Sequence, residues 1–249
     1  MQIIPSRHPL HRRSFLHATG KFAAAAAVLP ATLLAQKTTR QEQHEQFYDV
    51  STNEHLMREH GILQRVLVIY DEVIRRIDAK QDFPPQTVID SAEIIRKFIE
   101  DYHEKLEEEH LFPLFRQYSR REDVLRLYAQ KLVDLVDVLH EQHQAGRRLT
   151  DQILSTLKSL KTADDRQKLA RDLRAFIRMY VPHEAREDTV LLPALHVIVT
   201  RQEYEALGAK FDEIQHNTFG GDGCDFYLDQ VTAFEKRLGI YDLAQFTPK

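Results

Sequence analysis

Apolar residues recur at alternating steps of three and four along most of the chain after residue 52. In the first stretch the apolar seam passes through Leu56, Leu63, Leu67 and Ile74. This spacing is typical of an amphipathic helix that buries one face. The same pattern recurs three more times, so we predict four long helices over about residues 52–79, 85–118, 122–160 and 164–199.

The connections between these stretches are short. The segment DFPPQT (82–87) interrupts the pattern after the first helix, and Thr162, Asp164 and Asp165 offer N-caps to the fourth. Short connections between long helices imply antiparallel neighbours. The predicted fold is therefore all-α, an antiparallel up-down four-helix bundle over residues 52–200.

The remaining residues, 201–249, form a predicted C-terminal helical extension. We expect a helix to about residue 212, a glycine-rich loop at 220–223 and a second helix to about residue 238. These helices either cap the bundle or present a surface to a protein partner, and the sequence leaves both open.

The N-terminal segment differs from the rest. Residues 1–35 contain four basic and no acidic residues, and include the apolar run FAAAAAVLPATLLA (22–35). This arrangement predicts an export signal cleaved near Ala35, followed by a linker over 36–51. The segment HRRSFLH (11–17) resembles a twin-arginine signal, which implies export of an already folded protein to the periplasm or beyond. A disordered basic tail is the alternative.

Composition narrows the chemistry. The single cysteine, Cys224, excludes an internal disulfide and any cysteine-based zinc site. After removal of residues 1–35, 30 Lys and Arg face 38 Asp and Glu. Such an acidic protein is a poor candidate for binding nucleic acid or an anionic membrane, and we expect no stable membrane insertion once the signal is cleaved.

Polar residues occupy positions where a bundle core should be apolar. The phrases HEKLEEEHLFP (103–113) and HEAREDTVLLP (183–193) repeat the same His, Glu, Leu and Pro positions 80 residues apart. Two further histidines lie on the seams of the first and third helices. Burial of such groups is costly unless they are paired or bind metal. The six candidate metal ligands are His60, His103, Glu107, His143, His183 and Glu187.

Four imidazoles and two carboxylates suit two metal ions, each held by two histidines, with both glutamates shared. The alternative to metal binding is a set of hydrogen-bonded core histidines and a solvated run of acidic residues. Six such residues at one depth of the bundle favour metal.

Other histidines fit the pattern less well. His55 should point away from the seam, so we expect His55→Ala to leave metal binding and stability unchanged. His140 lies one step off its seam. His110 shares a face with Glu107 but has Val190 as its counterpart in the second phrase.

The prolines of the two phrases suggest irregular helices. Pro182 predicts a kink or bulge immediately before His183, because proline cannot donate a backbone hydrogen bond. Pro113 and Pro193 either contribute to the site or, as we favour, only bend the long helices around the core.

These residues together resemble the hemerythrin-like family, also called the HHE cation-binding domain, over about residues 53–199. The motifs are REHGILQRVL (58–67), YHEKLEEEHLFP (102–113), EQHQAGR (141–147) and PHEAREDTVLLP (182–193). The resemblance implies an antiparallel four-helix bundle with a non-haem di-iron centre, in which the four histidines are terminal ligands and the two glutamates bridge. Manganese and zinc are alternative metals.

One departure affects the functional expectation. The oxygen-carrying members have His-x-x-x-His on the third helix, whereas here Arg147 follows His143. We expect an exported di-iron protein that binds or reacts with dioxygen, nitric oxide or peroxide. The alternatives are a di-iron redox enzyme of peroxidase or nitric oxide reductase type, an iron delivery or storage protein, and a metal-stabilised scaffold for a protein partner.

Overall fold

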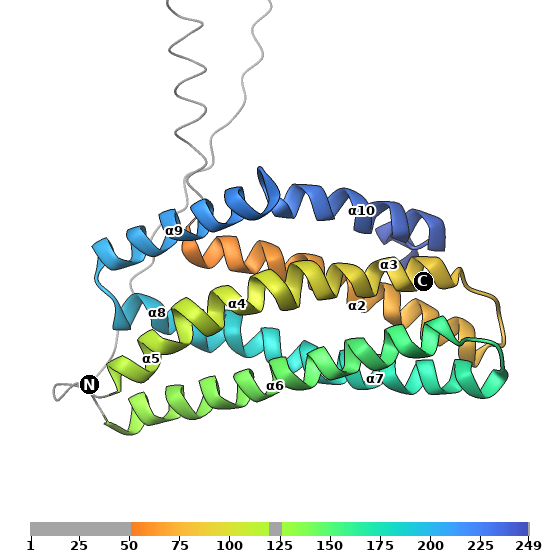
Figure 1. Ribbon diagram of the computed structural model, residues 1–249, viewed down its shortest axis with the longest axis horizontal. Coiled ribbons are helices and arrows are strands. Elements are labelled where there is room, and N and C mark those ends of the chain that lie inside the picture. The colour runs from red at the N-terminus through yellow and green to blue at the C-terminus, as the bar shows by residue number, and fades with distance from the viewer. Residues whose placement is uncertain (1–50, 120–125, 249) are drawn as a thin grey trace, which may run out of the picture. The chain divides into compact units, whose positions relative to one another are not determined.

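The computed structural model describes residues 51–119 and 126–248 (Figure 1). The predicted signal peptide (1–35) and nearly all of the predicted linker (36–51) lie outside the described residues. Everything described belongs to the unit Val50–Lys249. Across these residues the protein is helical and contains no β-strand, which confirms the predicted all-α class.

The first two helical segments agree with the apolar pattern. Helix α2 (Thr52–Asp78) begins after Ser51, whose hydroxyl accepts a hydrogen bond from the Glu54 amide. The second segment is one continuous rod in Figure 1 and contains two π-helical stretches. Its parts are α3 (Pro85–Ile94), η1 (Ile95–His103), α4 (Glu104–Leu106), η2 (Glu107–Leu111) and α5 (Phe112–Tyr118).

The third and fourth segments follow the same plan. Helix α6 (Arg126–Lys158) is described from Arg126, so its predicted start near residue 122 lies outside the described residues. Thr162 caps the fourth segment in a capping box with Asp165. That segment consists of α7 (Ala163–Arg186), η3 (Glu187–Leu191) and α8 (Leu192–Ile198).

The C-terminal region contains more helix than predicted. Helix α9 (Arg201–Phe219) does not stop near residue 212; it continues to Gly220, where a positive φ of 73° ends it. After the short loop come α10 (Gly223–Leu238) and the 3₁₀ turn η4 (Leu243–Phe246).

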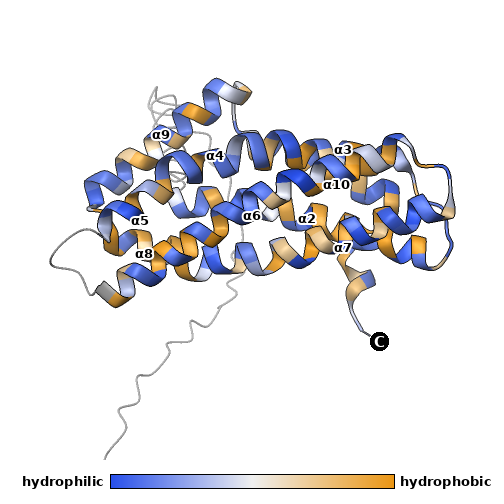
Figure 2. Cartoon of the chain, turned by 60° about the horizontal axis from the view of Figure 1, so that its bottom comes forward, coloured by the Kyte–Doolittle hydropathy of each residue, from blue (hydrophilic) through white to orange (hydrophobic). Residues whose placement is uncertain are grey.

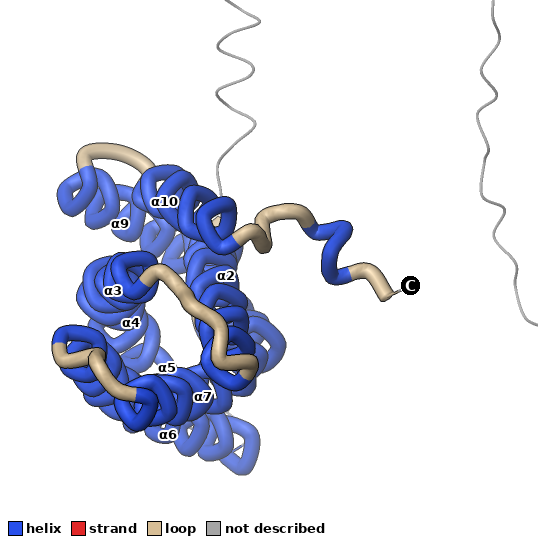
Figure 3. Tube along the Cα trace, turned by 90° about the vertical axis from the view of Figure 1, so that its right-hand side faces the viewer, coloured by secondary structure: helices blue, strands red, loops and turns tan. Residues whose placement is uncertain are grey.

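The four long segments pack around a common core. Helix α7 lies against both α2 and α6, the second rod contacts α2 and α6, and α10 lies outside against α2 and α3 (Figure 3). Apolar positions gather on the inner faces, as the hydropathy colouring of Figure 2 shows. The largest fully buried side chains include Tyr70, Phe98, Phe112 and Phe176. In the described part of the chain, no helix has the length and hydropathy that a membrane span requires.

The π-helical stretches η2 and η3 lie within the repeated phrases, and η1 ends at His103, where the first phrase begins. In both copies a wide turn begins at the glutamate, Glu107 or Glu187, and the residue five positions on donates its amide to that glutamate's carbonyl. Pro113 and Pro193 follow directly, where a regular α-helix would need an amide that proline lacks. Pro182 lies inside α7, which continues to Arg186, and the wide turn begins at Glu187. The kink or bulge predicted immediately before His183 stays a prediction. Short π stretches are frequent at functional sites.

Candidate metal centre

The structure brings all six predicted site residues together in the core. They come from four helical segments, and each side chain belongs to a residue at most 3% exposed. Their ligand atoms form two compact groups, one of His60, His103 and Glu107, and one of His143, His183 and Glu187.

Each group contains a close pair of imidazoles that face each other. The Nε2 atoms of His60 and His103 lie 3.1 Å apart, and their ring centroids are 4.8 Å apart. The ring centroids of His143 and His183 are 5.0 Å apart. We name these the first pair (His60 and His103) and the second pair (His143 and His183).

The two glutamates lie between the pairs. Glu107 Oε2 is 3.8 Å from His103 Nε2 and 3.5 Å from His143 Nε2. Glu187 reaches His183 Nε2 at 3.1 Å with Oε1 and His60 Nε2 at 3.4 Å with Oε2. Each carboxylate therefore faces one imidazole of each pair, which is the arrangement that a bridging ligand requires.

The centre is electrostatically incomplete without a cation. The carboxylate oxygens of Glu107 and Glu187 and the Nε2 atom of His143 are buried and accept or donate no hydrogen bond. Burial and the adjacent Glu187 raise the pKa of Glu107 well above its ordinary value. Burial lowers the pKa of His143 to about 4, despite its bond to Glu108. Buried polar groups in folded proteins are normally satisfied, so this cluster lacks a partner.

The outer nitrogen of every imidazole is held by a hydrogen-bond acceptor. The Nδ1 atoms lie 2.6 to 3.0 Å from side-chain oxygens. The pairs are His60 with Asp188, His103 with Glu59, His143 with Glu108, and His183 with Gln142. This leaves all four Nε2 atoms directed inward, and such outer bonds fix the orientation of metal-ligating histidines.

The spacing of residues along each helix does not identify these four acceptors. A signal was present, since each is the immediate neighbour of a predicted ligand. Glu59 and Gln142 precede the histidines of α2 and α6, and Glu108 and Asp188 follow the two glutamates. Each acceptor, however, serves a ligand on another helix, and only the packing of the helices shows that pairing.

The rival histidines stay outside the two groups. His110 packs against the ring of Phe211 on α9. His140 is half exposed, and its Nδ1 lies 3.8 Å from Glu108. Neither contributes to the inner cluster.

His55 stays outside the centre, as its position around α2 predicts, but it is buried. It is only 5% exposed and does not point into solvent. Its Nε2 lies 3.1 Å from Glu59 Oε1 and 2.6 Å from the side-chain amide of Gln215 on α9. A polar chain therefore runs from α9 through His55 and Glu59 to His103, because α2 and α9 are packed closely enough to bury the ring.

A second buried network adjoins the second pair. The Tyr180 hydroxyl donates to Glu104 Oε1 at 2.8 Å, and Arg147 Nη2 lies 2.8 Å from Glu104 Oε2. Gly146 provides the space for the phenol, since a Cβ atom there would lie 2.0 Å from the Tyr180 oxygen. Gly146 thus allows the close approach of α6 and α7.

An apolar groove between α2 and α7 leads toward the centre. It has a volume of about 620 Å³ and is lined by Leu67, Val181 and Phe246 among others. Glu184 lines both this groove and the small space enclosed by the four histidines. Burial raises the pKa of Glu184 to about 8. Glu184 thus connects the groove to the candidate centre.

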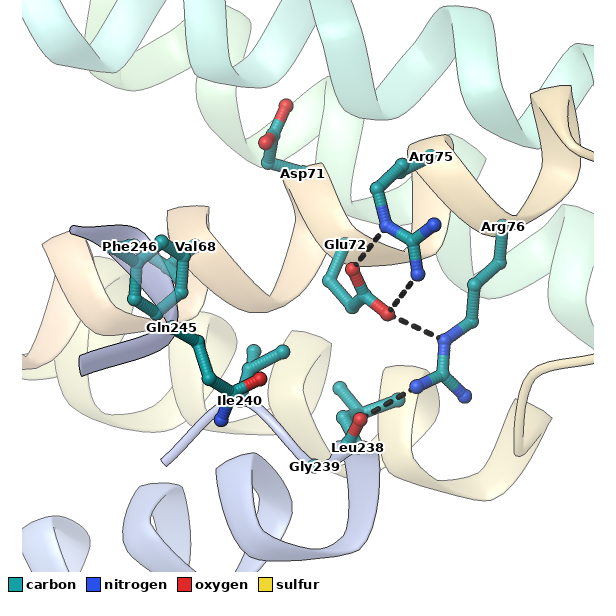
Figure 4. Close-up of a pocket in the computed structure, with 10 residues that line it drawn as sticks. All are labelled: Val68, Asp71, Glu72, Arg75, Arg76, Leu238, Gly239, Ile240, Gln245 and Phe246. Carbon is teal, nitrogen blue, oxygen red and sulfur yellow. Dashed lines mark hydrogen bonds and ion pairs between the residues drawn. The ribbon is translucent and has the colours of Figure 1, made fainter. Parts of the chain in front are cut away.

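Figure 4 shows a neighbouring, more polar crevice between α2 and the C-terminal segment. Glu72 accepts hydrogen bonds from both Arg75 and Arg76, and Arg76 also donates to the Leu238 carbonyl. The arginine charges are therefore paired within the crevice, which gives it no free cation for an anionic ligand.

Comparisons with known proteins agree with the resemblance. Residues 134–239 match the family described as Hemerythrin HHE cation binding domain. This range includes His143, His183 and Glu187 but omits the first two long segments, whereas the predicted resemblance spanned 53–199. An uncharacterized protein of Mycobacterium tuberculosis is 46% identical over 206 residues, which cover 82% of this chain and 76% of that protein. An uncharacterized protein of Mycobacterium bovis matches with the same values. No solved structure matches.

Proposed function

We propose, on the premise that residues 134–239 match the Hemerythrin HHE cation binding domain family, that the chain is an exported di-iron protein that binds or reacts with a small ligand. The ligand would be dioxygen, nitric oxide or peroxide. The proposed fold is the antiparallel up-down four-helix bundle of that family, with α9 and α10 as its cap.

One observation carries the metal assignment. Two buried carboxylates without hydrogen-bond donors face four inward-directed imidazole nitrogens. Burial of unpaired charge is strongly unfavourable, whereas a pair of cations would satisfy every one of these atoms. The donor set therefore fits the family's metal.

The proposed ligands of the two ions correspond to the two compact groups of ligand atoms. His60 and His103 would hold one ion, His143 and His183 the other, and Glu107 and Glu187 would bridge them. Nitrogen and carboxylate oxygen donors suit iron and also accept manganese and zinc. Held by these residues, a ferrous pair would supply electrons for reaction with a small oxidant or diatomic ligand.

The chain's own residues restrict which ligand can enter. The space among the histidines has a cavity volume of about 0 Å³, because packed side chains fill it. The approach through the groove is largely apolar, with Glu184 at its inner end. Such a path favours a small, weakly polar molecule over a charged metabolite.

The export proposal depends on residues 1–35, with their paired arginines and short apolar run. Separation of cell compartments would locate the protein, and the N-terminal sequence of the mature chain would identify the cleavage point. A cytoplasmic protein that retains residue 1 would contradict export and leave the metal proposal standing.

Elemental analysis of the purified mature protein tests the metal proposal. We expect close to two irons per chain, and the optical spectrum of an oxo-bridged iron pair that changes with nitric oxide or peroxide. Zinc, or no metal after purification under conditions that preserve iron, would contradict it.

A second candidate is a di-iron redox enzyme of peroxidase or nitric oxide reductase type. The buried Tyr180 hydroxyl, hydrogen-bonded to Glu104 beside the second pair, favours it because a phenol can supply an electron and a proton. Steady turnover of peroxide or nitric oxide with an added reductant would support an enzyme, and Tyr180→Phe should then slow turnover at unchanged iron content. A stable adduct without turnover would exclude it.

A further inference from the structure

The four acceptors of the imidazole Nδ1 atoms occupy positions that repeat between the two halves of the bundle. One of the four differs from the others in its side-chain chemistry. Glu59 and Gln142 occupy equivalent positions, because each directly precedes a candidate ligand histidine, His60 on α2 or His143 on α6. Glu108 and Asp188 are likewise equivalent, each directly after a bridging glutamate. Three of the four are carboxylates, and Gln142 alone is an amide.

The exception makes the two pairs unequal. In the first pair both Nδ1 atoms form hydrogen bonds with carboxylates. His60 bonds to Asp188 at 2.8 Å, and His103 bonds to Glu59 at 2.6 Å. In the second pair His183 ends on the neutral amide oxygen of Gln142 at 2.9 Å.

The single carboxylate behind the second pair is also shared. Glu108 Oε1 accepts from His143 Nδ1 at 3.0 Å and lies 2.9 Å from the Arg147 guanidinium. An arginine on the same oxygen draws negative charge away from the imidazole. No arginine or lysine contacts Glu59 or Asp188 in the ion pairs of the described residues; Glu59 instead contacts His55.

A carboxylate that accepts from a ligating imidazole raises the basicity of that ligand and stabilises a positive metal, and a neutral amide does so less. We propose that the two metal positions are inequivalent by construction. The first pair loads first and holds its ion more tightly, and Gln142 keeps the second pair weaker. This inference rests on the proposed metal function.

A titration of the metal-free full chain with Fe²⁺ under argon tests it. Wild type should bind two ions in steps that differ at least about tenfold, the lower end of effects seen when outer partners change. His60→Ala should abolish the tight step, and His183→Ala should weaken only the loose one. Equal steps in wild type would overturn the inference.

The reciprocal isosteric variants Gln142→Glu and Glu59→Gln give the sharper comparison. Gln142→Glu should tighten the second step about tenfold or more, while Glu59→Gln should weaken the first step by a similar factor. A gain in affinity cannot result from damage to the fold, so the first variant separates an electronic effect from a structural one. An unchanged or weaker second step in Gln142→Glu would overturn the inference.

A spectroscopic measurement supplies an independent test. With one equivalent of ⁵⁷Fe²⁺, the Mössbauer spectrum of wild type should show one predominant doublet, whereas Gln142→Glu should divide the iron between two environments. An even division in wild type would contradict the inference alone. No Fe²⁺ binding by any of these proteins would contradict the proposed function as well, so the two failures are distinguishable.

Discussion

The Nδ1 atom of His103 lies 2.6 Å from Oε2 of Glu59, and the other oxygen of Glu59 lies 3.1 Å from His55. One buried carboxylate thus joins an inward-facing histidine to a histidine that cannot reach the centre. The contact continues to Gln215, so one side chain, His55, links a residue of α9 to Glu59, which supports the proposed ligand His103. The C-terminal helices are therefore part of what holds the centre in place.

We predict that His55→Ala lowers iron affinity about tenfold, in contrast to the neutral result expected from the sequence. Loss of the ring removes the ion-pair contact of His55 with Glu59 and leaves a buried cavity, so the carboxylate is less firmly directed at His103. Metal titration and thermal unfolding of the variant would measure both effects. His216→Ala is the control, because His216 is an exposed histidine on α9, next to Gln215. Equal behaviour of the two variants would contradict a supporting role for His55.

Glu107→Gln should have opposite effects on the thermal stability of the metal-free and the metal-bound protein. Without metal, the substitution removes an ionisable group whose pKa burial and Glu187 raise, so the melting temperature should stay the same or rise. With metal, a bridging ligand is lost. If affinity falls below the metal concentration used, a stabilisation of about 2.7 kcal/mol at a hundredfold excess over Kd disappears.

Thermal unfolding with and without a chelator would test this prediction. The metal-dependent increase in melting temperature should be large in wild type and small in Glu107→Gln, with iron per chain reduced in parallel. His103→Ala and Glu187→Ala should also lose metal. A variant that keeps both irons and the full increase would show that Glu107 is not a ligand.

Gly146→Ala should destabilise the protein by about 1–3 kcal/mol, the usual cost of overpacking a core. A Cβ atom at this position would overlap the Tyr180 hydroxyl, so α6 and α7 must separate or the phenol must leave Glu104. Gly61→Ala is the matched control. No atom lies within 4 Å of the added carbon, and it should stabilise α2 by roughly 0.5–1 kcal/mol. Urea unfolding would rank the three proteins, and equal stability of the two variants would contradict the proposed role of Gly146.

The helices and the six central residues were accessible from the sequence because both depend on local spacing. Periodic apolar positions identify a buried face, and polar residues on that face must be satisfied there. His60, His103, Glu107, His143, His183 and Glu187 were found in this way, and the structure places them together. That they bind iron stays a prediction until metal is measured.

The features that were missed depend on contacts between helices. His55 is about 140° around α2 from His60, so the spacing places it away from the seam but does not show what covers it. The bundle buries it because α9 covers that face, and α9 continues beyond its predicted end. The π turns at Glu107 and Glu187 were also missed, although the repeated prolines six residues later were visible. A proline shows that a backbone bond is absent, but only the structure shows where the helix widens.

Val181→Trp should slow access of a small ligand without changing the centre. Val181 is 53% exposed and lines the apolar groove, so a tryptophan there can fill the groove without disturbing the core. We expect nitric oxide to bind at least several times more slowly in stopped-flow measurements, with unchanged iron content and an unchanged final spectrum. Val197→Trp is the control, since Val197 is 63% exposed on α8 and does not line the groove. Equal association rates for the two variants would show that ligands enter by another route. A loss of iron in Val181→Trp would instead mean that the substitution reached the centre through Glu184.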